Sequence, residues 1–408
     1  MPSNSRRASW VGVAVLIAFG CAVAAVLVSC HSDRITGINE GPLDPALVAQ
    51  GKTIFRLDTY GDESFWTDTL QLNQVIQSSV SPKTALAVGL KVDVDTLPAA
   101  VKTALQAGQV NLDDPATTVT LLKLGAVVGV IGTVDANNNL TSVGITCAFC
   151  HSTVDNSFAP GIGHRQDGWP NHDLNVGAIV ALSPVLPAPA KAVYNSWGPG
   201  MYDPRFNIDG QNMPVVIPAA FGLRHVAKEI YTGDDTISYW NKYVAVTQMH
   251  GHGSFSDARI GVNVNNPPQN VTTAKLAALR EYQFSLTTPP APSGLDPAAV
   301  ARGRTVFAGD GKCVSCHVGD QLTDVNSGKL HTPAEVGQSA AYAQRSATKL
   351  YRTTPLRGLY HPPQLQGPYF HDGSAATLDD VVNHYVPLLG LTLTAQQKAD
   401  LVTYLKSL

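Results

Sequence analysis

The sequence predicts a mainly α-helical protein built from two tandem domains, the first of which is enlarged by an insertion. Three observations support this fold class. A pentad of the form Cys-x-x-Cys-His occurs twice, at residues 147–151 and 313–317. An Asp-Pro-Ala segment typical of a helix start precedes each pentad, and a segment with apolar residues at helical spacing closes each half of the chain.

The pentad is the attachment signature of a c-type haem. Two thiols two residues apart can add to the vinyl groups of one porphyrin, and the next residue brings an imidazole to the iron as proximal ligand. A redox dithiol or half of a zinc site also uses two cysteines, but neither requires the histidine. We therefore expect two cytochrome c-type domains with two covalently attached haem c groups, held by Cys147 and Cys150 with His151, and by Cys313 and Cys316 with His317.

An internal repeat sets the predicted domain boundaries. Residues 43–55 reappear as residues 295–307, and the closing segment 275–286 reappears as 397–408. In each opening segment an aspartate is placed to cap the helix and a proline occupies its first turn. These repeats predict an N-terminal haem domain at 43–286, a proline-rich linker at 287–294 and a C-terminal haem domain at 295–408.

An insertion at residues 56–146 separates the opening helix of the first domain from its pentad. Helices are expected at 69–78, 99–107 and 117–128, and the Asp-Ala-Asn-Asn-Asn run at 135–139 predicts a turn. No known chemistry is recognisable in this segment.

Charge excludes one class of function. The chain of 408 residues carries 28 lysines and arginines against 31 aspartates and glutamates, for a net charge of −3. Because proteins that bind nucleic acid carry a strongly basic surface, no nucleic-acid partner is expected.

The N-terminus predicts export from the cytoplasm. Arg6 and Arg7 precede an apolar run at residues 10–28, and Leu-Val-Ser-Cys at 27–30 resembles the cleavage and lipidation site of bacterial lipoproteins. We expect a signal peptide at 1–30, a lipid on Cys30 that anchors the protein to a membrane, and a tether at 31–42. Cys21 is a second possible lipidation site, and an uncleaved signal anchor is a further alternative. Each interpretation places the body on the periplasmic or cell-surface side.

Two segments near the C-terminus, residues 351–359 and 368–385, resemble the bacterial dihaem cytochrome c peroxidase and MauG-like family. The similarity covers the C-terminal domain, and in the N-terminal domain it is confined to the pentad and the layout. It implies that the C-terminal haem takes electrons from a small cytochrome or cupredoxin. The N-terminal haem would then meet peroxide or another small oxidant.

The resemblance also implies a methionine or tyrosine as distal ligand of the C-terminal haem. All four methionines precede residue 250, so the C-terminal domain contains none. Tyr385 occupies the corresponding position, with His384 as its rival. Tyr385 continues the apolar stripe of the helix that starts after Thr377, whereas His384 is turned by roughly 100°; a solvated helix edge is the structural alternative for both. Arg357 is a candidate partner for a propionate, and His371 for a hydrogen bond near the haem.

For the N-terminal haem the distal candidates lie in residues 240–253, just before the closing helix. Met249, His250 and His252 could each bind iron, and His250 or His252 could provide the acid–base group that peroxide cleavage needs. Alternatively, the two histidines only bridge backbone groups in a glycine-rich turn. The sequence leaves this choice open.

Two classes of function follow. The first is a peroxidase-like oxidoreductase with one open iron, and the second is an electron-transfer cytochrome with both irons six-coordinate. The family signature and the histidine-rich distal turn favour the enzyme.

Overall fold

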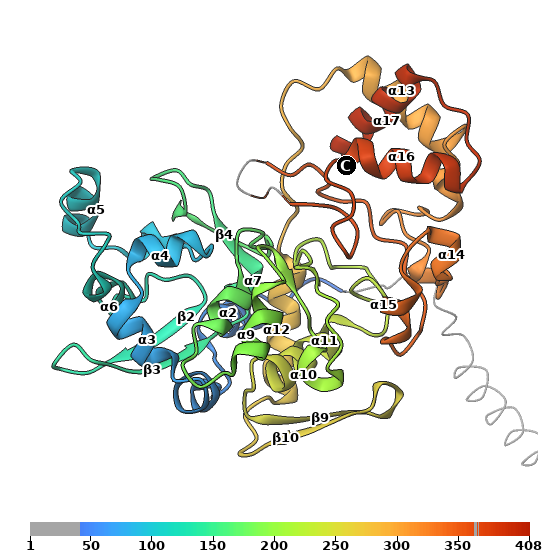
Figure 1. Ribbon diagram of the computed structural model, residues 1–408. Coiled ribbons are helices and arrows are strands. Elements are labelled where there is room, and N and C mark those ends of the chain that lie inside the picture. Colours follow the sequence, from blue (N-terminus) through green and yellow to red (C-terminus); the bar gives the residue numbers. More distant parts are fainter. Residues whose placement is uncertain (1–40, 363–364, 366) are drawn as a thin grey trace, which may run out of the picture. The chain divides into compact units, whose positions relative to one another are not determined.

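The structure is a computed structural model that describes residues 41–362, 365 and 367–408. It is mainly helical, as the sequence predicts (Figure 1). The expected signal peptide, both N-terminal cysteines and residues 31–40 of the tether lie outside the described residues. Among the helices of the described part, none has the length and hydropathy needed to cross a membrane.

The opening and closing helices of each predicted domain pack against each other. In the first domain these are α2 (Pro45–Leu57) and α12 (Thr273–Ser285), and in the second they are α13 (Pro297–Ala308) and α17 (Ala395–Lys406). The expected caps are present, because the side chains of Asp44 and Asp296 accept backbone N–H groups of the first turn of α2 and α13. Residues 287–294, the predicted linker, form neither helix nor strand.

A glycine lies at the crossing point of each pair. A Cβ on Gly51 would come within 1.9 Å of the Ala278 carbonyl oxygen, and one on Gly303 within 2.0 Å of the Asp400 carbonyl oxygen. One turn further along, each helix pair has an edge-to-face contact between two aromatic rings. The ring centroids are 5.4 Å apart for Phe55 and Tyr282 and 5.3 Å apart for Phe307 and Tyr404. The sequence repeat is therefore also a repeat of structure.

The insertion forms short helices and one hairpin. The helices are α3 (Leu72–Ser79), α4 (Pro82–Ala87), α5 (Ala99–Gln106) and α6 (Pro115–Lys123), and the hairpin joins β2 (Val130–Val134) to β3 (Leu140–Ile145). The predicted turn is confirmed, since the Asp135 carboxylate accepts the N–H groups of Asn137 and Asn139.

One predicted helix is too long. The expectation of a helix over 117–128 is wrong beyond residue 123, because Gly125 adopts a φ of +64° and the valines after it lead into β2. β-Branched residues favour the extended conformation, and the periodicity of a short apolar run does not separate the two states.

The remaining elements of the first predicted domain are short. They are η1 (Ser64–Thr69), β1 (Val92–Asp93), η2 (Val94–Thr96), α7 (Ala148–His151), β4 (Ser152–Val154), β5 (Ile162–Gly163), β6 (Arg165–Asp167), α8 (Val176–Ala181), α9 (Ala188–Asn195), β7 (Met201–Tyr202), α10 (Phe206–Asp209), β8 (Val215–Val216), α11 (Ile237–Tyr243), η3 (Val244–Gln248), β9 (Gly253–Asp257), η4 (Ala258–Ile260) and β10 (Val262–Asn266). Their strands pair only two by two: β1 with β5 in parallel, and β4 with β6, β7 with β8 and β9 with β10 antiparallel.

The second predicted domain adds η5 (Cys313–Ser315), η6 (Val325–Ser327), α14 (Pro333–Val336), α15 (Ala340–Gln344) and α16 (Leu378–Leu388). The pentad cysteines border three apolar clusters. Cys150 packs against the cluster of the insertion, Cys147 against the cluster of α2 and α12, and Cys313 against the cluster of α13, α16 and α17. A covalently bound group at either pentad would therefore meet an apolar core.

Candidate haem sites

The first pentad presents two thiols and one oriented imidazole. Cys147 directly precedes α7, and neither Cys147 nor Cys150 is in a disulfide. Burial raises the pKa of each thiol to about 12. The Nδ1 of His151 donates to the Pro218 carbonyl at 3.1 Å, which leaves Nε2 without a hydrogen-bond partner among the described residues. Burial lowers the pKa of His151 to about 4, so the imidazole is neutral at pH 7, the form that binds iron.

The second pentad repeats this donor set. Cys313 begins η5, and neither Cys313 nor Cys316 is in a disulfide. The Nδ1 of His317 donates to the Leu322 carbonyl at 2.8 Å, and burial lowers the pKa of this histidine. Both proximal candidates thus have Nδ1 fixed by a backbone carbonyl and Nε2 available to a metal.

Arg357 has a buried hydrogen-bond donor without a partner among the described residues. It donates from Nη2 to the Asp320 carbonyl, three residues after the pentad, while its buried Nε has no hydrogen-bond partner among the described residues. A buried N–H without a partner is costly, and a propionate would remove this cost. The thiols, the imidazoles and this arginine fit a covalently attached haem.

Tyr385 and His384 lie in different surroundings on α16. Burial raises the pKa of Tyr385 to about 12, and the neighbouring thiols of Cys316 and Cys313 add to this effect, so the phenol lies near the second pentad. His384 instead donates through Nε2 to the Val336 carbonyl at 2.9 Å. The helix continues through Pro387 to Leu388. Of this pair, Tyr385 therefore lies beside the thiols of the second pentad, and His384 is engaged by the Val336 carbonyl.

His371 packs among tyrosines. Its Nε2 lies 3.3 Å from the Tyr351 hydroxyl, and its ring is 4.6 Å from that of Tyr342. Within the described part of the chain, it makes no hydrogen bond or ring contact with either pentad.

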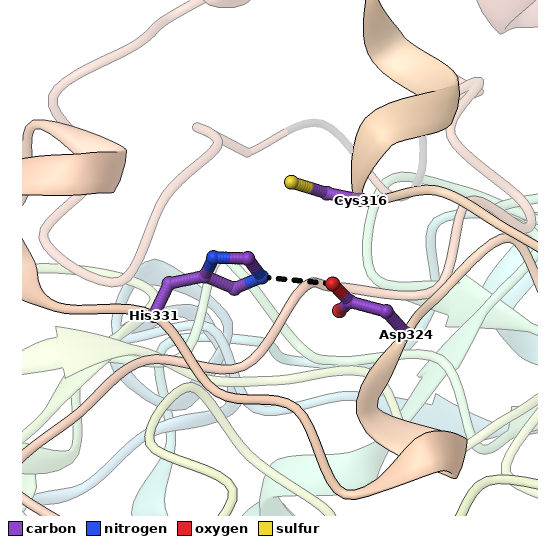
Figure 2. A group of neighbouring side chains, drawn as sticks. All are labelled: Cys316, Asp324 and His331. Atoms are coloured by element: carbon purple, nitrogen blue, oxygen red, sulfur yellow. Dashed lines mark hydrogen bonds and ion pairs between the residues drawn. The ribbon is translucent and has the colours of Figure 1, made fainter.

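A buried acid–base pair lies beside Cys316, and the sequence analysis did not find it. His331 Nε2 is 3.0 Å from Asp324 Oδ2 and 3.0 Å from the Thr353 hydroxyl, and one ligand atom from each of Cys316, Asp324 and His331 falls within 4.8 Å of the others (Figure 2). Such a trio could bind a metal ion. If Cys316 is consumed in a thioether, only two donors remain, and Asp324 then acts as a fixed negative charge near His317.

Met249 is in the core near the first pentad. It is 3% exposed and belongs to the same apolar cluster as Ala148 of the pentad. Its carbonyl accepts the indole N–H of Trp66 at 3.2 Å, and the Trp66 ring lies 6.4 Å from that of Phe149. The predicted distal segment and the first pentad are thus in one packed region.

The two histidines after Met249 differ. The His250 ring stacks on Phe65, with centroids 3.7 Å apart, and burial lowers its pKa to about 4. The His252 ring lies against Gly61, where an added Cβ would come within 2.5 Å of Nδ1. Its backbone N–H donates to the Tyr60 carbonyl at 2.7 Å. His250 is therefore placed as a neutral imidazole, and His252 is part of a tight backbone turn.

Two further residues of the first site had no signal in the sequence. Tyr60, 1% exposed and with a φ of +56°, has its hydroxyl near Cys147. Asp62, fully buried, accepts the Ile145 N–H, and burial raises the pKa of its carboxyl to about 9. Both lie between α2 and η1, a π-helical turn of the kind that often marks functional sites.

Comparison with known proteins finds similarity over part of the chain. No family model matches. The methylamine utilization protein MauG of Methylorubrum extorquens is 28% identical over 156 residues, which are 32% of this chain and 43% of that protein. The gamma subunit of hydrazine synthase of Kuenenia stuttgartiensis is 32% identical over 179 residues, which are 34% of this chain and 50% of that protein. The chain thus matches half or less of the length of these relatives.

Among solved structures, hydrazine synthase of Kuenenia stuttgartiensis pressurized with xenon is similar at 20% identity and a TM-score of 0.38, over 53% of this chain and 78% of the other. A MauG-like protein associated with microbial copper homeostasis is similar at 15% identity and a TM-score of 0.33, over 49% and 77%. Similarity at these TM-scores does not establish a shared fold.

Proposed function

We propose that this protein is a dihaem c-type cytochrome and a peroxidase-like oxidoreductase. The resemblance to the bacterial dihaem cytochrome c peroxidase and MauG-like family, together with the similarity to MauG, supports this proposal. Electrons enter at the C-terminal haem from a small cytochrome or cupredoxin. Peroxide or a similar small oxidant is reduced at the N-terminal haem.

The observation that carries this proposal is the repeated donor set. Each pentad has two thiols in no disulfide and an imidazole with Nδ1 on a backbone carbonyl, at His151 and at His317. The bound haems supply one-electron chemistry, and the chain orients and insulates them.

The two sites differ in the side chains available as a sixth ligand. Near the second pentad lies the Tyr385 phenol, so this haem is proposed to be six-coordinate and to serve electron transfer. For the first, the candidate is the buried His250 imidazole, which stacks on Phe65 and is neutral at pH 7. It can accept the proton of a bound peroxide and return it to the departing oxygen, as general acid–base catalysis requires.

The second candidate function is that of an electron-transfer cytochrome without peroxidase activity. Met249 favours it, because a buried thioether beside the first pentad is a common sixth ligand in electron-transfer haems.

The localisation proposal rests on the N-terminal sequence. A periplasmic or cell-surface lipoprotein anchored through Cys30 fits the export signal and the need of c-type haem for attachment outside the cytoplasm.

The test uses the purified holoprotein. Acid–acetone extraction should leave two haems on the chain, and ferrous protein should bind carbon monoxide at one haem. Hydrogen peroxide should be reduced with a reduced cytochrome as donor. His250→Ala should lower this turnover about 100-fold or more, as expected for loss of a general acid–base group. His164→Ala is the matched control, since that exposed imidazole pairs with Asp95. Absence of carbon monoxide binding and of turnover would establish the electron-transfer cytochrome instead.

A further inference from the structure

A cavity of about 520 Å³ is lined by residues of the insertion together with Ile162 of β5, and none of the residues that line it belongs to a pentad. The cavity is bounded by α3, α4, α5, α6 and the start of β2. Ligand pockets generally have volumes of roughly 300–1,000 Å³, so this cavity is large enough for a small molecule. None of the residues that line the cavity has a role in the proposed haem chemistry.

The walls are almost entirely aliphatic. Leucine, isoleucine, valine, alanine and proline dominate the lining, and none of the described residues in it is aromatic. An ordered water needs two to four polar partners, and the few polar residues of the lining, Lys91, Asn111, Thr117, Thr118 and Thr120, leave most of the walls unable to bind water. An empty cavity would cost stability in proportion to its volume. The lining therefore suits an aliphatic chain better than water or a ring that seeks stacking partners.

Helix α5 provides a second observation. Its apolar side chains Val101, Ala104 and Leu105 border the cavity, yet no residue of α5 is buried. Figure 1 shows α5 at the edge of the insertion. An amphipathic helix normally packs its apolar face against another element. Val101 and Leu105 are only partly buried against the apolar cluster of the insertion, and an occupant between α5 and α6 would complete their burial.

The charge of the lining indicates the head group. Among the described residues that line the cavity, Lys91 is the one that ionises; its side chain is 5% exposed and forms an ion pair with Asp173, whose side chain is 64% exposed. A carboxylate arriving from the cavity can share or replace this solvated partner, whereas a cationic head group would be repelled.

We propose that the cavity binds a single-chain anionic amphiphile of the fatty-acid type. Its aliphatic chain lies against α5 and α6, and its carboxylate pairs with Lys91. The volume fits one chain, and the predicted membrane anchoring would place the protein where such molecules are available.

The test measures binding of dodecanoate, below its micellar concentration, to the holoprotein by titration calorimetry. Ala104→Phe fills the cavity and should weaken binding at least tenfold, as should Ala100→Phe at a second lining position. Ala99→Phe is the matched control, because Ala99 is an exposed residue of the same helix outside the lining, and its affinity should stay unchanged. Absence of dodecanoate binding, or equal loss in the lining variants and the control, would overturn the proposal.

The charge is tested separately with dodecanol, which has the same chain without the carboxylate. Dodecanoate should bind at least tenfold more tightly than dodecanol, and Lys91→Met should abolish this difference. Asp173→Asn removes the partner of Lys91 and should strengthen dodecanoate binding. Equal affinities for the two probes in the wild-type protein would overturn the assignment to a fatty acid. The intact haem spectrum verifies that each variant is folded.

Discussion

Tyr385 and His384 are adjacent in sequence but have different partners, and this difference predicts how the second haem responds to substitution. Tyr385→Phe removes the oxygen near Cys313 and Cys316, and should convert this haem to high spin, because the Val336 carbonyl engages the His384 imidazole. His384→Ala should leave the spin state unchanged and lower stability by about 1 kcal/mol for the lost hydrogen bond. Resonance Raman and low-temperature electron paramagnetic resonance distinguish the two. A high-spin His384→Ala protein with an unchanged Tyr385→Phe spectrum would make the histidine the ligand.

Asp62 predicts a pH dependence of stability. Burial raises the pKa of its carboxyl from 3.8 to about 9, so the folded protein keeps the proton that the unfolded chain releases near pH 4. Between these values, the free energy of unfolding should fall by about 1.4 kcal/mol per pH unit, or roughly 4 kcal/mol by pH 7. Asp62→Asn retains an acceptor for the Ile145 N–H and should lack this fall. Urea unfolding between pH 4.5 and 8 measures it, and parallel curves for the two proteins would contradict the prediction.

At the scale of elements, the paired helices depend on close backbone approach. Gly51→Ala and Gly303→Ala each place a Cβ about 2 Å from a carbonyl oxygen of the facing helix. Each should lower the free energy of unfolding by roughly 1–3 kcal/mol, although alanine is intrinsically the better helix former by about 1 kcal/mol. Gly41→Ala is the control, since a Cβ on Gly41 would have no atom of the described residues within 4 Å beyond its chain neighbours. Unchanged urea midpoints in both helix variants would contradict the prediction, because they would mean that the facing helices can move apart to accept the added Cβ without loss of stability.

Elements with a local chemical signal were predictable, and those decided by distant packing were not. Asp44 and Asp296 marked two helix starts, because a cap and a first-turn proline act within a few residues. The strands β2 and β3 were not predicted, although the turn at 135–139 that joins them was. Of the candidate sites, the two pentads and the position of Tyr385 on α16 were proposed from spacing alone. Tyr60 and Asp62 were not, because only the folded chain brings them beside Cys147.

At the scale of the whole molecule, arginines link the two predicted domains: Arg352 pairs with Glu229 at 2.9 Å, and Arg345 pairs with two aspartates. Arg345, 2% exposed at its side chain, donates to Asp203 at 2.9 Å and to Asp209 at 2.7 Å, and the Asp203 side chain is fully buried. These residues lie on opposite sides of the linker in sequence. Removing the guanidinium from the buried Asp203 carboxylate is costly, because water cannot reach this carboxylate to replace its partner.

Arg345→Met should therefore destabilise the protein by about 3–5 kcal/mol, since it leaves Asp203 buried and unpaired. The double variant with Asp203→Asn should recover part of this loss, because the stranded charge is then absent. Lys83→Met is the control, because Lys83 and Asp113 are both exposed and the loss of their ion pair should cost less than about 1 kcal/mol. Urea unfolding followed at both haem bands measures these values. Equal losses in Arg345→Met and Lys83→Met would contradict the role of Arg345.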